Sequence, residues 1–124
     1  MSIQINQYLV YGFYLPFKEA RQCLIDKHTE DGYDEIADKY HDNAFKKDIV
    51  AINDCSLIED GMNGEYTFFG KIFKKASDGC HLETSEMPKV GKKIKDNVKK
   101  EFEAMFGDKF SDFHAKIMLI THYR

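Results

Sequence analysis

Hydrophobic segments follow one another along the chain in an order that few folds can accommodate. Four of them are short, rich in β-branched and aromatic residues and bounded by turn residues, which is typical of strands. They cover residues 7–15, 48–58, 65–76 and 115–123. Two glycines and an asparagine between the second and third segments predict a hairpin turn over residues 59–64.

The segments that separate these strands have helical spacing instead. Apolar residues recur every three to four positions from Pro16 to His28, and again from about Tyr33. The clearest helix is predicted from Pro88 to Phe106, just before a glycine. The order β-αα-β-β-α-β predicts an α+β fold, a ferredoxin-like split βαβ sandwich with a four-stranded antiparallel sheet and helices on one face. An α+β fold with a four-stranded meander contains the same elements and is the alternative.

Length and composition are those of a small folded protein. The 124 residues suffice for one core, so we expect a single domain over residues 1–124. Three cysteines without CxxC spacing indicate reduced thiols rather than a disulfide framework. The chain has no signal-peptide pattern and no apolar run that could span a bilayer. We therefore expect a cytoplasmic protein without a membrane partner.

Side-chain alternation along the third predicted strand divides it into two faces. One face carries Thr67, Phe69, Lys71 and Phe73. A lysine is unsuited to a position beneath helices, so this face is expected to point to the helix-free side of the sheet. Phe69 and Phe73 would then be exposed, and an apolar surface of this kind favours contact with another protein.

The fourth predicted strand is divided in the same way. Ile117 and Leu119 are expected to be buried, and the alternating set is expected to be exposed: Lys116, Met118, Ile120 and His122. The two exposed faces together predict an interface for a second copy of the chain or for a host protein. That interface consists of Phe69, Lys71, Phe73, Met118 and Ile120.

One face of the last predicted helix is strongly basic, although the formal net charge of the chain is −3. It carries Lys89, Lys92, Lys93, Lys95, Lys99 and Lys100. The simplest interpretation is a solvated helix face. The alternative is a docking surface for an acidic protein or a phosphate, which with the strand aromatics allows a nucleotide- or nucleic-acid-binding function. The acidic first half of the chain would repel a phosphate backbone, so nucleic acid is the less favoured partner.

No residue pattern indicates catalysis, a bound metal or a cofactor, and we expect none of the three. The histidines lack the HxxxH or HxH spacing that places two imidazoles on one face. Cys80 and His81 leave open a small phosphate-processing enzyme that also uses a lysine such as Lys71. A thiolate nucleophile needs a base and an oxyanion site as well, and the sequence shows neither.

Residues 7–16, QYLVYGFYLP, resemble the first strand of small uncharacterised bacteriophage proteins, in which a short tail precedes a YLxYG-type strand. The resemblance implies a non-structural accessory protein that acts in the cytoplasm of an infected bacterium by binding a host or defence protein. It transfers no site residue to this chain. Together with the predicted interface, it leads to the hypothesis of a small non-catalytic accessory protein that binds a host protein, associates with itself, or does both.

Overall fold

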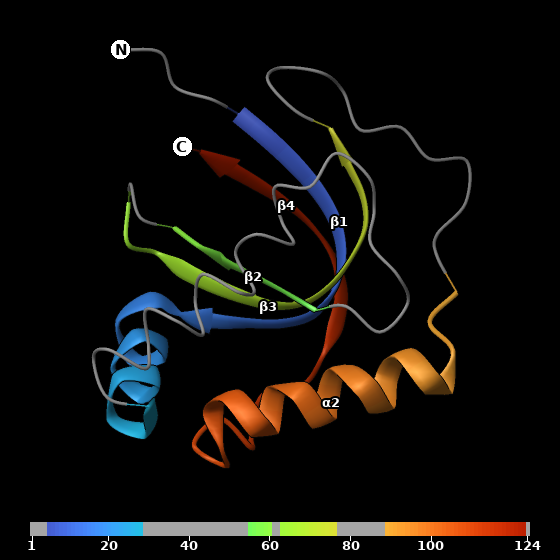
Figure 1. Cartoon of the computed structure of the whole chain (residues 1–124). Helices are drawn as coiled ribbons and strands as arrows, with labels where there is room; N and C mark the ends of the chain where they lie inside the picture. The colour runs from blue at the N-terminus through green and yellow to red at the C-terminus, as the bar shows by residue number, and fades with distance from the viewer. Residues whose placement is uncertain (1–4, 29–54, 61–62, 77–88, 124) are drawn as a thin grey trace.

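The computed structural model describes residues 5–28, 55–60, 63–76 and 89–123 (Figure 1). Within these ranges the chain forms strands β1 (Ile5–Pro16), β2 (Ser56–Glu59), β3 (Tyr66–Ala76) and β4 (Lys116–Tyr123). It also forms two helices, the N-terminal helix over residues 17–28 and α2 (Lys92–Phe106). The predicted α+β class is confirmed. The helix predicted from Tyr33 and most of the second predicted strand lie outside the described residues.

The four strands form an open sheet in which every neighbouring pair is antiparallel, as predicted. Their order is β2-β3-β1-β4, so β1 and β3 are central and β2 and β4 form the edges. The predicted hairpin joins β2 to β3. Its turn is held by the buried carboxylate of Asp60, which accepts the backbone N–H groups of Asn63 and Glu65, each at 3.1 Å. The carboxylate thereby fixes the register of β2 against β3.

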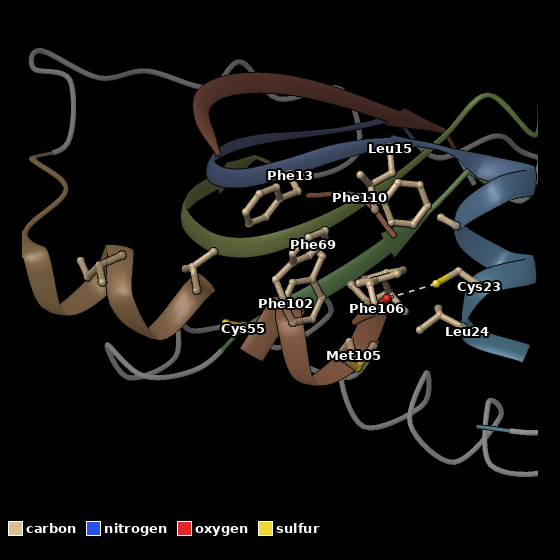
Figure 2. Close-up of a cluster of buried hydrophobic side chains, with 14 residues drawn as sticks. Phe13, Leu15, Cys23, Leu24, Cys55, Phe69, Phe102, Met105, Phe106 and Phe110 are labelled. Carbon is tan, nitrogen blue, oxygen red and sulfur yellow. Dashed lines mark hydrogen bonds between the residues drawn. The ribbon is translucent and has the colours of Figure 1, made fainter. Parts of the chain in front are cut away.

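Both described helices pack against the same face of the sheet. Their apolar side chains join those of the strands in one buried cluster, the helix-side core (Figure 2). At its centre the rings of Phe13 and Phe102 stack with centroids 3.8 Å apart and planes 11° apart. The face that α2 buries is the one its sequence spacing predicts, and it consists of Ile94, Val98, Phe102, Met105 and Phe106.

The N-terminal helix also closes the C-terminal end of α2. The last carbonyl groups of a helix have no partner within the helix itself. Three side chains of the N-terminal helix lie within hydrogen-bonding distance of oxygens in the last turn of α2: Cys23 Sγ at 3.3 Å from Phe106, Lys27 Nζ at 3.2 Å from Glu103, and His28 Nε2 at 2.9 Å from Met105. The Glu103 oxygen also accepts the backbone N–H of Gly107. The Lys27 charge also suits the negative end of the helix dipole. The two helices are therefore joined by polar contacts as well as by the core.

A second buried cluster, the inner cluster, occupies the opposite face of the sheet. It contains Tyr8, Val10, Ile58, Tyr66, Phe68, Ile72 and Ile120. The prediction that this face is open to solvent was wrong, because these side chains are buried. The sheet curves strongly in Figure 1, with both described helices on the outside of the curve, so the inner cluster lines its inside.

Two glycines that pair across β1 and β3 make this curvature possible. A Cβ atom on Gly12 would collide with the carbonyl oxygen of Phe69 and lie 2.7 Å from the Cα atom of Gly70. A Cβ atom on Gly70 would collide in turn with the carbonyl oxygen of Tyr11. Both strands approach too closely here for any side chain on the inner face, which is why each position requires glycine.

We predict that Gly12→Ala and Gly70→Ala each lower the free energy of unfolding by about 3 kcal/mol, because the backbone must shift to admit the methyl group. The measurement is urea unfolding followed by circular dichroism. The control is Gly91→Ala, where an added Cβ meets nothing within 4 Å and only the N-cap of α2 changes, with an expected cost of at most about 1 kcal/mol. Equal effects at all three positions would contradict the role given to the glycine pair.

Candidate functional site

The residues of the predicted interface do not share one surface. Phe69 is fully buried beneath α2, with its ring centroid 6.2 Å from that of Phe102, and Phe73 packs against the same core. The assignment of this face of β3 to the helix-free side was wrong. It depended on Lys71, which is only 5 % exposed in spite of its charge. A lysine can bury its aliphatic stem, so a single lysine is a poor guide to the phase of a strand.

From Ile117 onward the burial pattern of β4 is the reverse of the predicted one, whereas Lys116 is exposed as predicted. Met118 packs against the inner cluster and Ile120 belongs to it, with an exposed fraction of 4 %. Ile117 and Leu119, which were expected to be buried, are 38 % and 59 % exposed. The reason is the position of β4 at the edge of the sheet. The aromatic side chains of α2 pack on β1 and β3, where they contact Phe13 and Phe69, and so leave the same face of β4 uncovered.

Exposed apolar side chains therefore gather at the edge of the sheet. Ile117, Leu119 and Tyr123 alternate along one face of β4, and Ile5 pairs with Tyr123 across the β1–β4 ladder. We call these four residues the β4 edge surface. The sequence contains no signal for it, because only the place of β4 at the edge of the observed order β2-β3-β1-β4 leaves these side chains uncovered by the described helices.

Within the described residues, the outer side of β4 lacks the features that usually protect a sheet edge. In the described part of the chain β4 pairs with β1 alone, in a register without a bulge. Residues 117–121, IMLIT, contain no charge and no proline. Exposed edges with these properties readily pair with another strand. The opposite edge, β2, has four residues and is mostly buried.

A groove runs between α2, β1 and the segment that leads into β4, and has a volume of about 750 Å³. Tyr11, Phe13 and Phe102 contribute aromatic rings to it. Lys95 and Lys99, one helical turn apart, lie on its α2 side. We call it the α2 groove. The remaining charged residues that line it are Asp96, Glu103 and Asp108, and His114 lines it as well.

The predicted basic face of α2 is exposed at all six lysines. Two of them, Lys95 and Lys99, line the α2 groove, and the other four do not. Lys92 and Lys93 lie at the N-terminal end of α2, where Gly91 provides no side-chain cap and the first turn has no acidic residue. Positive charge at this end opposes the helix dipole. Lys92 and Lys93 therefore do not stabilise α2 through its dipole.

A polar contact crosses the inner face of the sheet. The hydroxyl of Tyr66, at the start of β3, lies 2.7 Å from Nδ1 of His122, near the end of β4. Burial raises the pKa of Tyr66, and the neighbouring carboxylate of Asp60 raises it further. The hydroxyl therefore stays protonated and can donate to the imidazole. Its role is to tie the two ends of the curved sheet together.

The remaining predicted chemistry is not brought together in the described residues. Cys80 and His81 lie outside them. Within the described ranges no three His, Cys, Asp or Glu side chains are grouped to hold a metal ion, and no helix is long and apolar enough to cross a bilayer. No protein-family model, curated protein or solved structure matches the chain.

We predict that the protein loses stability at alkaline pH and that Tyr66 contributes to this loss. Its pKa is raised in the folded state, so its contribution is complete below the unfolded pKa of about 10 and declines as the pH rises above it. In Tyr66→Phe, loss of the hydrogen bond to His122 should cost about 1 kcal/mol at neutral pH. The decline above about pH 10 should be shallower than in the wild type. Urea midpoints across this range provide the test, and an unchanged slope would contradict the assignment.

Proposed function

We propose that the protein is a non-catalytic binding protein that contacts a partner protein through the β4 edge surface. The observation that carries the proposal is the combination of an unprotected sheet edge with exposed Ile117, Leu119 and Tyr123. A partner strand that added to β4 would satisfy its outward backbone groups, and apolar side chains on the partner would cover the exposed row. The partner chemistry is therefore an uncharged, extended segment with alternating apolar residues.

We propose further that the fold is the ferredoxin-like split βαβ plan predicted from the sequence. The all-antiparallel order β2-β3-β1-β4 and the packing of both described helices on one face support this. The phage-like opening, the cytoplasmic location and the host or defence partner remain predictions. They fit a small protein whose most distinctive surface is a binding edge rather than a catalytic cleft.

Capture of binding partners by tagged variants tests the edge. Leu119→Lys adds a charge to the edge surface at a position that is 59 % exposed, so the fold should be retained. The control is Ala104→Lys, which adds the same charge on the exposed side of α2. We expect proteins captured by the wild type and by Ala104→Lys to be lost from Leu119→Lys, as measured by quantitative mass spectrometry. Equal capture by both variants would contradict the proposal.

The α2 groove supports a second candidate function, the binding of a small aromatic anion such as a nucleotide. Its volume lies within the range of about 300–1,000 Å³ that is usual for small-molecule sites. Aromatic rings offer stacking surfaces, and Lys95 and Lys99 offer charge for a phosphate. The acidic residues that share the groove oppose an anion, which is why this function ranks second.

Lys99 and Lys100 are adjacent in α2 and provide a matched pair of variants that tests this second candidate function. Lys99 lines the groove, whereas Lys100 is exposed on the same helix and does not. If the groove binds a nucleotide, Lys99→Glu should weaken adenosine triphosphate binding by about tenfold or more and Lys100→Glu should leave it nearly unchanged. Calorimetric titration measures both. Equal losses would indicate unspecific attraction to the lysine face and would exclude the groove as the site.

A further inference from the structure

We infer that the partner of the β4 edge surface is a second copy of this chain, paired antiparallel along β4 around a two-fold axis. The inference rests on the proposed function, since it names the partner of the same edge. The resulting dimer contains one continuous eight-stranded sheet, with the helices of both copies on the same face. Three properties of β4 lead to this occupant rather than to an unrelated strand.

The first property is that β4 is complementary to itself. In an antiparallel pair, residues directly opposite each other share a face of the sheet. If Ile120 lies on the two-fold axis, Ile117 of one copy faces Tyr123 of the other, and Leu119 faces Thr121. Aromatic rings beside β-branched side chains are favourable cross-strand pairs. Every member of the exposed row thus gains an uncharged neighbour.

The second property is the absence of charge along the edge. Residues 117–121 carry neither acidic nor basic side chains, so β4 has no feature that would select a partner strand of opposite charge. The same register also places Met118, rather than the charged Lys116, opposite His122 of the other copy. Over residues 117–123, pairing between identical copies therefore brings no like charges together.

The third property is the difference between the two edges of the sheet. Pairing of β4 with β2 of another copy would be head-to-tail and would extend into a filament. β2 has only four residues, of which three are buried, so it offers little edge for this purpose. β4 has eight residues and lies at the opposite edge. Pairing of β4 with itself is closed and stops at two copies.

The expected dimer is weak. Specific interfaces of standard size bury about 800 Å² per partner, and one strand edge with four exposed apolar side chains offers less than this. Dimerisation should therefore occur at micromolar concentrations and depend on protein concentration. It should be insensitive to salt, because no ion pair holds the interface.

Sedimentation analysis over a concentration series, with the full chain, tests the inference. The wild type and Ala104→Lys should dimerise alike, whereas Leu119→Lys and Tyr123→Lys should each raise the dissociation constant by at least about tenfold. Circular dichroism confirms that each variant is folded. Hydrogen exchange locates the interface: amides of β4 should become slower to exchange as the concentration rises, and amides of the other edge, β2, should not change.

Two results would overturn the inference. One is a chain that stays monomeric at millimolar concentration, and the other is a dimer that Leu119→Lys leaves intact. Neither result by itself removes the proposed function. If the protein is monomeric but Leu119→Lys still abolishes capture of other proteins while Ala104→Lys does not, the edge binds a heterologous strand. If capture is also insensitive to Leu119→Lys, both proposals fail.

Discussion

The close approach of Gly12 and Gly70 is the constraint on which the rest of the structure depends. Because neither residue has a Cβ atom, β1 and β3 can curve together at the centre of the sheet. The curvature brings the start of β3 to the end of β4, where the Tyr66 hydroxyl reaches His122. The inner cluster is buried within this curve, and the described helices are left to cover the outside.

The helices in turn determine which part of the sheet stays exposed. α2 is drawn over β1 and β3 by the aromatic side chains around Phe102, and the N-terminal helix holds its C-terminal end through the polar contacts described above. Neither arrangement extends the helix layer over β4. Leu119 is therefore exposed on the same face of the sheet on which Phe69 is fully buried. The binding edge is a consequence of where the core is centred.

Sequence patterns predicted the elements well and their faces poorly. Helical spacing identified the buried face of α2, and Gly107, with a φ angle of 68°, ends the helix as predicted. In β3, however, both alternating sets are mainly apolar between Tyr66 and Phe73, where Lys71 is the one charged residue, because this part of the strand is covered on both sides. In such a strand, the alternation of side chains does not show which of the two sets faces the helices. The prediction of which face of β3 points away from the helices depended on Lys71 alone, and it was wrong because Lys71 is buried.

For β4, the sequence of the strand itself does not determine which of its side chains are exposed. KIMLITHY is apolar on both faces, and only the position of the strand in the sheet separates a buried Ile120 from an exposed Leu119. Exposure of apolar side chains costs solubility unless another surface covers them. A central strand pairs with a neighbouring strand of the same chain on both sides. An edge strand pairs on one side only, so the backbone N–H and C=O groups on its other side can still accept a partner strand. The composition of β4 is that of a strand in the interior of a sheet, and pairing with a further strand would place it there.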